Sequence, residues 1–118
     1  MNISPKELAI KIVGALSEKK AQDIKVLTVE SLTSITDYFV ICTGSSTTQI
    51  KAMTDFTLEK CKEDNITPKH IEGYRDANWI LIDFGDVVVH VFHSEMRGFY
   101  SLERLWADAP LLDIKGIV

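Results

Sequence analysis

Residues 79–93 form two largely apolar runs joined at Gly85-Asp86, and we predict that they fold as a β-hairpin. Runs of β-branched and aromatic residues flank Gly85-Asp86, and a Gly-Asp pair in that setting is typical of a short hairpin loop. With a loop of this length, Ile82 lies opposite Val89, and both side chains point to one wholly apolar face. We therefore expect that face to lie in the core. The opposed pairs expected on it are Phe84–Val87, Ile82–Val89 and Ile80–Val91.

The opposite face of this hairpin is also largely apolar. Because side chains alternate along a strand, Trp79 and Leu81 project to this face together with Asp83. A sheet that is apolar on both sides is either sandwiched between layers or keeps one side for a partner. The hairpin sequence leaves both alternatives open. The opposed pairs expected on this second face are Trp79–Phe92, Leu81–His90 and Asp83–Val88.

Hydrophobic residues recur at helical spacing in three other segments. The first segment follows Ser4, and Glu7 stands three residues after it, as in a capping box. The second follows Ser46, with Gln49 in the equivalent place, and the third follows Ser94 and stops before a proline. We therefore predict helices over about residues 5–20, 47–64 and 95–109.

Short runs rich in β-branched residues predict further strands over residues 23–29, 37–43 and 68–72. The unbroken apolar run in 37–43 is typical of a strand central to a sheet. The residue pattern after Pro110 predicts no regular element, and we expect this tail to be less ordered than the rest of the chain. The predicted order is α-β-β-α-β-β-β-α, without repeats or linkers. It indicates an α/β fold: one domain, residues 1–118, with a mixed β-sheet and flanking helices.

Composition narrows the range of partners. The net charge of −4 argues against a broad phosphate-binding surface, so we expect little direct contact with nucleic acid. No window approaches the roughly 20 apolar residues that span a bilayer, and the first residues do not resemble a signal peptide. We therefore expect a cytoplasmic protein without membrane contact. Cys42 and Cys61 lack metal-ligand spacing and are expected to be reduced packing residues.

One turn could in principle bind phosphate. Gly44-Ser45-Ser46 lies between a predicted strand and a predicted helix, but it lacks the glycine spacing of a P-loop or a dinucleotide site. Nucleotidyltransferases open with a similar turn and need paired carboxylates, one residue apart on a strand, to hold magnesium. Here Asp83 and Asp86 are three apart and divided by the hairpin turn. We therefore expect no cofactor, no metal site and no catalytic residue, and the histidines His70, His90 and His93 have no spacing that changes this expectation.

The longest motifs resemble one known family. They are residues 37–46 (Asp-Tyr-Phe-Val-Ile-Cys-Thr-Gly-Ser-Ser), Glu72-Gly73, residues 79–92 (Trp-Ile-Leu-Ile-Asp-Phe-Gly-Asp-Val-Val-Val-His-Val-Phe), and Arg97 with residues 99–106 (Phe-Tyr-Ser-Leu-Glu-Arg-Leu-Trp). Together they look like the ribosomal silencing factor family, also called Iojap-like, over nearly the whole chain. The resemblance implies a scaffold related to nucleotidyltransferases without their catalytic acids, and hence a binding protein that is not an enzyme. It also implies binding to the fourteenth ribosomal protein of the large subunit, which would block joining of the small subunit and repress translation under nutrient limitation.

The residues and the resemblance together predict a protein-binding face on the outer side of the hairpin. Trp79 and Leu81 would form its apolar centre, and charged residues its rim, a composition typical of protein recognition. The acidic rim is expected to meet basic groups of the partner, and a histidine on this face would make binding sensitive to pH. The predicted set is Trp79, Leu81, Asp83, Tyr74, Arg75, Asp76, His90, Glu95, Pro110 and Leu111.

Two alternatives stay open. A small nucleotide-binding or nucleotidyltransferase enzyme would use the Gly44-Ser45-Ser46 turn and hold magnesium with Asp83 and Asp86. A self-association module would instead pair the apolar face with its copy in a homodimer, which can coexist with silencing.

Overall fold

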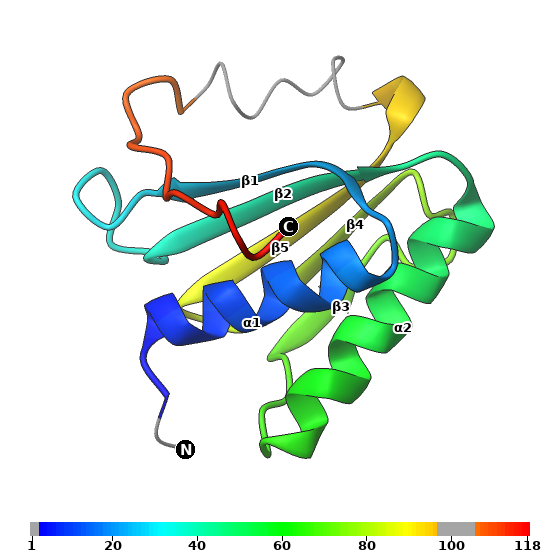
Figure 1. Cartoon of the computed structure of the whole chain (residues 1–118), viewed down its shortest axis with the longest axis horizontal. Helices are drawn as coiled ribbons and strands as arrows, with labels where there is room; N and C mark the ends of the chain where they lie inside the picture. The colour runs from blue at the N-terminus through cyan, green and yellow to red at the C-terminus, as the bar shows by residue number, and fades with distance from the viewer. Residues whose placement is uncertain (1–2, 97–105) are drawn as a thin grey trace.

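A five-stranded mixed sheet with two helices on one face forms the frame of the protein (Figure 1). The structure is a computed structural model and describes residues 3–96 and 106–118. Its strands follow the spatial order β1-β2-β5-β4-β3, so β1 and β3 are the two edges. The elements are α1 (Pro5–Glu18), β1 (Gln22–Thr28), β2 (Tyr38–Gly44), α2 (Thr47–Glu63), β3 (His70–Glu72), β4 (Trp79–Asp83) and β5 (Val87–His93).

The predicted hairpin is confirmed in its register. β4 and β5 are antiparallel, with Ile82 opposite Val89 and Trp79 opposite Phe92. β5 also pairs with β2, and this central pair is parallel, because the chain leaves β2 through α2 and returns after β3 and β4. The other neighbouring strands are antiparallel, so the predicted mixed sheet is confirmed.

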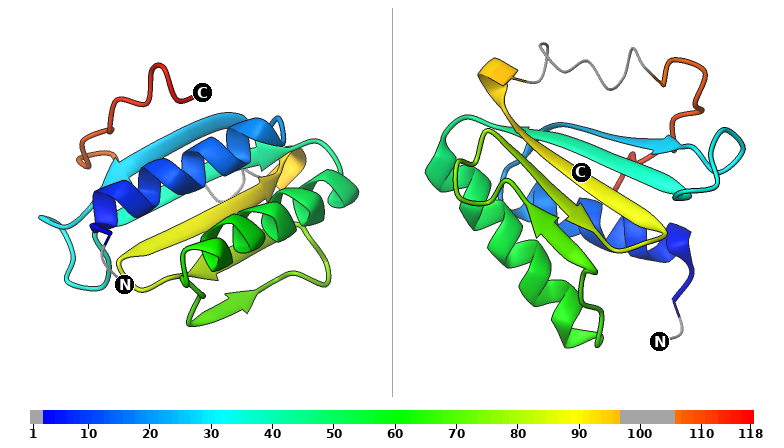
Figure 2. Two further views of the ribbon diagram at one scale, coloured as in Figure 1. Left: turned by 60° about the horizontal axis from the view of Figure 1, so that its bottom comes forward. Right: turned by 180° about the vertical axis from the view of Figure 1, so that it is seen from behind.

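The main hydrophobic core lies between the sheet and the helix pair (Figure 2). α1 contributes Ile12 and Leu16, which are fully buried, and α2 contributes Ile50 and Met53. The predicted inner face of the hairpin is confirmed, since its alternate residues all belong to this core or pack against it. Cys42 and Cys61 are also buried there as free thiols, as predicted. The inner-face residues from the hairpin are Ile80, Ile82, Phe84, Val87, Val89 and Val91.

The start of α1 confirms the predicted capping box. The Ser4 side chain accepts a hydrogen bond from the Glu7 N–H at 3.1 Å, and the Glu7 carboxylate accepts one from the Ser4 N–H at 3.2 Å. The third predicted helix falls largely on residues 97–105, which lie outside the described residues. In the described part of the chain, no helix has the length and apolar character needed to cross a bilayer.

The second predicted capping box is wrong in one half. Ser46 caps α2 by accepting a hydrogen bond from the Gln49 N–H at 3.1 Å. The Gln49 side-chain oxygen, however, accepts from the N–H of Ser45 at 2.7 Å and not from that of Ser46. The Gln49 amide nitrogen also donates to the Lys20 carbonyl at 3.2 Å. Gln49 therefore joins the end of α1 to the start of α2, a long-range contact that the local spacing could not predict.

The chain end runs along the outside of β1 (Figure 1). It pairs with β1 only through an isolated bridge between Leu27 and Leu111, and no strand is assigned within residues 106–118. This agrees with the predicted absence of a regular element after Pro110. Three of its apolar side chains pack against the main core and so extend that core past the sheet edge. These are Leu112, Ile114 and Ile117.

Candidate functional site

The sheet face remote from the helices is covered over β1, β2 and β5. A second, smaller cluster of buried residues lies there, with Trp106 and Ala109 of the segment after residue 105 packed on it. This part of the outer face is therefore core, the first of the two alternatives that the hairpin sequence left open. The cluster consists of Leu27, Val29, Ile41, Phe92 and Ala109, with Phe39, Trp79 and Trp106 partly buried against it.

The same face is more open over β4. A cavity of about 250 Å³ lies there, lined by Glu72, Gly73, Trp79 and Leu81. We call these four residues the β4 face. Trp79 and Leu81 are half-buried, and Glu72 is exposed directly opposite Leu81 across the β3–β4 pairing. The structure thus places the predicted apolar centre at a hollow on the surface, the arrangement that suits the insertion of a partner side chain.

Glycine is required at position 73 for the chain to pass this close to the start of β4. Gly73 has a φ of +78°, which side chains disfavour, and a Cβ there would lie 2.1 Å from the Trp79 carbonyl oxygen. The close approach holds the connection before β4 against the start of that strand. Our site prediction missed Glu72 and Gly73, although this pair is one of the motifs that carry the family resemblance.

The Trp79 side chain is hydrogen-bonded to a buried histidine, His90. Its indole N–H donates a hydrogen bond of 3.0 Å to His90 Nδ1, and its ring stacks on Phe92 with 5.0 Å between centroids. His90 in turn meets Phe39 edge-on at 5.1 Å. The tryptophan is therefore held by a hydrogen bond and by ring packing before any partner binds.

His90 itself lies beneath the surface. It is 4% exposed, so its predicted direct contact with a partner does not fit the structure. Burial lowers the pKa of His90 to about 4, because the charged imidazolium would lose its hydration. Protonation at Nδ1 would also remove the acceptor of the Trp79 hydrogen bond. His90 is consequently neutral near neutral pH, and the predicted pH-sensitive binding through this histidine is not supported.

Acidic side chains border the β4 face at the β3 edge. Asp83 accepts a hydrogen bond from the Gly85 N–H at 2.7 Å, which shapes the hairpin turn, and its second oxygen lies 3.7 Å from His70 Nδ1. The other nitrogen of His70 lies 3.1 Å from a Glu72 oxygen. Asp83 and Glu72 therefore stand on either side of one imidazole at the rim that the sequence predicted to be charged.

The connection before β4 is anchored on α2. The Tyr74 hydroxyl donates to both carboxylate oxygens of Asp55 at 3.0 Å, and the Lys51 ammonium lies 5.5 Å from the centre of the Tyr74 ring. The hydrogen bond to Asp55 raises the pKa of the Tyr74 hydroxyl, which stays a donor. The hydroxyl of the predicted partner residue Tyr74 is thus already bonded to α2, while the next two residues, Arg75 and Asp76, are exposed.

The predicted set does not form one continuous patch. Pro110 and Leu111 lie along β1, where the Pro110 carbonyl accepts a hydrogen bond from Thr28, and β2 and β5 separate them from β4. Strand order, which the hairpin pattern does not determine, puts them at the other edge. Glu95 is exposed just past the end of β5. The end of β5 lies next to the start of β4, because the His93 N–H donates a hydrogen bond to the Asn78 carbonyl at 2.9 Å.

The Gly44-Ser45-Ser46 turn is a packing turn. A Cβ on Gly44 would lie 2.7 Å from the Ile50 side chain, so glycine lets α2 approach β2 closely. The Ser45 N–H, which would face a phosphate, already donates to Gln49. Within the described ranges, no group of three or more potential ligands is placed to hold a metal ion around Asp83 and Asp86 or elsewhere.

Comparison with known proteins decides the family. A family model described as "Ribosomal silencing factor during starvation" matches residues 2–118. The ribosomal silencing factor RsfS of Halalkalibacterium halodurans is 41% identical over 116 residues, which cover 98% of this chain and 99% of that protein. The chain belongs to the ribosomal silencing factor family. The resemblance stated from the sequence motifs is thereby confirmed.

The family extends to solved structures and to organelle proteins. A crystal structure of a protein from Chromobacterium violaceum is similar to this chain, with a TM-score of 0.86 and 34% identity, and the match covers 89% of this chain and 88% of that one. A mouse protein named mitochondrial assembly of ribosomal large subunit protein 1 is 37% identical over 100 residues, which cover 80% of this chain and 43% of the mouse chain. The bacterial structure supports the α/β fold described above.

Proposed function

We propose that this silencing factor binds the large ribosomal subunit through the β4 face, docks on the fourteenth ribosomal protein and sterically prevents joining of the small subunit. The names of its relatives support a ribosomal role: one is a ribosomal silencing factor, and another is named for assembly of the ribosomal large subunit. The observation that carries the location is the hollow over Trp79 and Leu81 with acidic groups at its rim.

The contacts of Trp79 make it suited to anchor such an interface. A tryptophan held in place before binding loses little side-chain freedom on association, and large aromatic residues in partly enclosed hollows are the usual hot spots of interfaces. Leu81, on the same face of β4, extends the apolar contact. Truncation of Trp79 should therefore remove more binding free energy than truncation of any rim residue.

Charge favours a basic protein over bare RNA. Glu72 and Asp83 border the β4 face, and the chain carries a net charge of −4. Acidic groups steer Lys- and Arg-bearing partners and oppose the phosphate backbone. Within this proposal the factor works by occupying space, so it requires no catalytic residue and no cofactor.

The experiment is a binding titration against the purified fourteenth ribosomal protein and against isolated large subunits. We expect Trp79→Ala to weaken both interactions by at least about 2 kcal/mol, roughly thirtyfold in Kd. Glu72→Arg, at an exposed position, should weaken binding mainly through slower association. Leu32→Ala, at an exposed leucine on the connection between β1 and β2, is the matched control and should bind as wild type.

Circular dichroism and thermal melting must first show that each variant is folded. Wild-type affinity in a folded Trp79→Ala variant would contradict the β4 face as the interface. Subunit binding without binding to the isolated ribosomal protein would contradict the proposed docking partner alone. A homodimer that loses its self-association in Trp79→Ala and never binds subunits would favour the self-association alternative.

A further inference from the structure

The connection between β1 and β2 carries two large apolar side chains into solvent. It projects past the end of the sheet (Figure 1). Ile35 is 82% exposed and Leu32 is 45% exposed, and neither packs in the two buried clusters of the protein. A single exposed apolar residue is ordinary at a protein surface, whereas two on one short connection offer apolar area that a partner can bury.

The backbone of this connection is held by its own hydrogen bonds. The Val29 N–H donates to the Asp37 carbonyl at 2.9 Å and so closes the connection at its base. The Leu32 and Thr33 N–H groups both donate to the Val29 carbonyl, at 2.9 and 3.0 Å. The Ile35 N–H donates to the Thr33 hydroxyl oxygen at 3.2 Å. The two apolar side chains are therefore presented on an ordered turn, which lowers the entropy cost of binding.

Acidic side chains flank the apolar pair. Glu30 is exposed and Asp37 is partly exposed, and they stand at the two ends of the connection. Burial raises the pKa of the Tyr38 hydroxyl, and the carboxylates of Glu30 and Asp37 raise it further, so both lie near one point at the base of the connection. We name this surface the β1–β2 tip. It consists of Glu30, Leu32, Ile35 and Asp37.

No neighbouring cation along the chain offsets these acids. Residues 26–50, which include the whole connection, contain no Lys or Arg. Within the described residues, no ion pair joins Glu30 or Asp37 to a cation. A lysine does pack on the adjacent hairpin turn, where the Lys69 side chain lies against Gly85, but it precedes β3 at the opposite edge of the sheet. The tip is therefore apolar at its centre and negative at its border.

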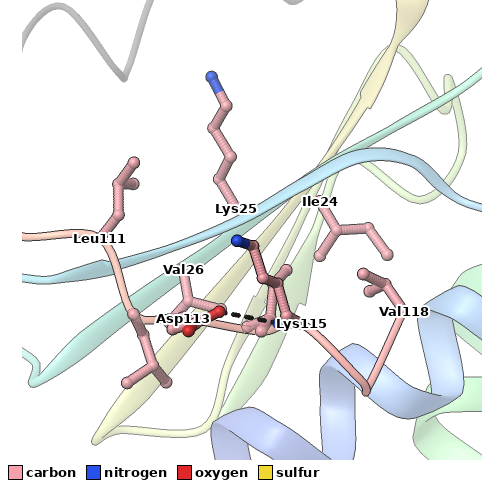
Figure 3. A pocket seen from close by; sticks show the side chains of 9 residues that line it. Ile24, Lys25, Val26, Leu111, Asp113, Lys115 and Val118 are labelled. Carbon is pink, nitrogen blue, oxygen red and sulfur yellow. Dashed lines mark hydrogen bonds between the residues drawn. The ribbon is translucent and has the colours of Figure 1, made fainter.

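The other surface feature along β1 has a mixed charge. A cavity of about 390 Å³ lies between β1 and the chain end, and its lining includes Lys25, Lys115 and Asp113 among mainly apolar residues (Figure 3). The Asp113 carboxylate accepts a hydrogen bond from the Lys115 N–H at 3.0 Å. Because two cations share this cavity with one acid, a basic ligand is complementary to the tip and not to the cavity.

We propose that the β1–β2 tip binds a basic amphipathic helix of a partner protein. The apolar stripe of that helix packs on Leu32 and Ile35, and Lys or Arg residues beside the stripe pair with Glu30 and Asp37. Apolar burial supplies affinity, and the complementary charges favour association and select the partner. An anionic bilayer and a second copy of this acidic chain are poorer matches, because each brings negative charge to the tip.

The tip and the β4 face lie at opposite ends of the sheet. β2 begins at Tyr38, which pairs with Val87 next to the tip. Trp79 lies at the other end, because it pairs with Phe92, and Phe92 pairs with Thr43 near the end of β2. A helix bound at the tip therefore leaves Trp79 accessible. Binding at the tip does not depend on docking through the β4 face, and both surfaces can be occupied together.

The test is an amide-resolved NMR titration of the full chain with the blocked peptide Ac-Lys-Leu-Ala-Lys-Leu-Leu-Lys-Ala-Leu-Lys-Lys-Leu-Leu-Lys-Ala-NH2. Its leucines recur at helical spacing and form one apolar stripe among lysines. We expect saturable shifts at Glu30, Leu32 and Ile35. An analogue with Glu in place of every Lys should bind at least about tenfold more weakly, and so should an isomer whose leucines lack helical spacing.

Variants locate the binding surface. Ile35→Ala should weaken peptide binding at least about fivefold, and Ile71→Ala, at an exposed isoleucine on β3, is its matched control. Glu30→Lys should weaken binding by a similar factor, with Glu63→Lys, at an exposed glutamate that ends α2, as the control for charge reversal. Folded Trp79→Ala should bind the peptide as wild type does, because the β4 face lies at the other end of the sheet.

Several outcomes would overturn the proposal. These are the absence of saturable shifts at the tip, equal affinity for the peptide and its Glu analogue, or unchanged affinity in Ile35→Ala. Shifts confined to β3 and β4 that disappear in Trp79→Ala would assign the basic helix to the β4 face. Shifts at the tip that grow with protein concentration without peptide would show that a second copy of the chain binds there. Tip shifts caused by phosphatidylcholine–phosphatidylglycerol vesicles and not by the peptide would identify a bilayer as the ligand.

Discussion

At the scale of single residues, Trp79 and His90 show how an aromatic side chain is kept rigid at a half-open surface. The 3.0 Å bond requires an unprotonated Nδ1 on His90, so the neutral imidazole carries its proton on Nε2. That nitrogen is buried without a hydrogen-bond partner in the described part of the chain. The hydrogen bond that fixes Trp79 therefore leaves the Nε2–H of His90 buried without a partner, which costs folding free energy. Protonation of the buried imidazole to its charged form would cost more free energy than this.

His90 makes folding stability depend on pH. Its pKa is about 4 in the folded chain and about 6.5 when unfolded, so the unfolded state binds the proton first as pH falls. The stabilisation from the neutral ring is complete above pH 6.5 and is lost progressively between pH 6.5 and 4. From pH 7 to pH 5 we expect His90 to contribute a loss of about 2 kcal/mol.

Urea unfolding at both pH values, for wild type and His90→Gln, measures this contribution. The glutamine oxygen can accept the Trp79 hydrogen bond but does not titrate, and the other ionisable groups act alike in both proteins. The difference in unfolding free energy between the two pH values should be about 2 kcal/mol smaller in the variant. Equal pH dependence in the two proteins would show that His90 is charged or exposed in the folded state.

At the scale of elements, the chain end acts as an extra layer on the β1 edge. Leu111 and Leu112 are adjacent in sequence but differ in environment: Leu111 is 62% exposed, whereas Leu112 packs against the main core. The hydrogen bond from the Leu112 N–H to β1 fixes this orientation. Docking of the chain end thus depends on alternation along a segment that never becomes a full strand.

The two leucines provide a matched pair of substitutions. Leu112→Ala removes buried methyl groups and should lower the unfolding free energy by about 2 kcal/mol. Leu111→Ala should change it by less than about 0.5 kcal/mol, because its side chain is largely in solvent. Denaturant unfolding of both variants is the measurement. Equal effects would show that the chain end does not pack on the core as described.

At the scale of the whole molecule, sequence predicted local pairing well and long-range placement poorly. The hairpin register followed from alternation and the Gly85-Asp86 turn, both of which lie within one short stretch. The covered half of the outer face could not be predicted, because it depends on Trp106 and Ala109 meeting strands far away in the chain. Strand order likewise separates Leu111 from Trp79, which our predicted site had grouped together.

The dimensions of the molecule suit a steric role. Its principal extents are 33 × 32 × 29 Å, so it would project by about the same distance from a surface in any orientation. If the β4 face rests on the large subunit, the helices on the other side of the sheet project away from it (Figure 2). A partner subunit approaching that surface would then meet α1 and α2. Blocking would follow from docking alone, without any change in conformation.

Subunit joining is the most direct test of this account. Large and small ribosomal subunits are mixed with the factor, and the joined fraction is measured on sucrose gradients. We expect wild type and Leu32→Ala to keep the subunits apart and folded Trp79→Ala to allow joining at the same concentration. If Trp79→Ala blocks joining as well as wild type, or if wild type leaves joining unchanged while bound, the β4 face does not silence the ribosome by exclusion.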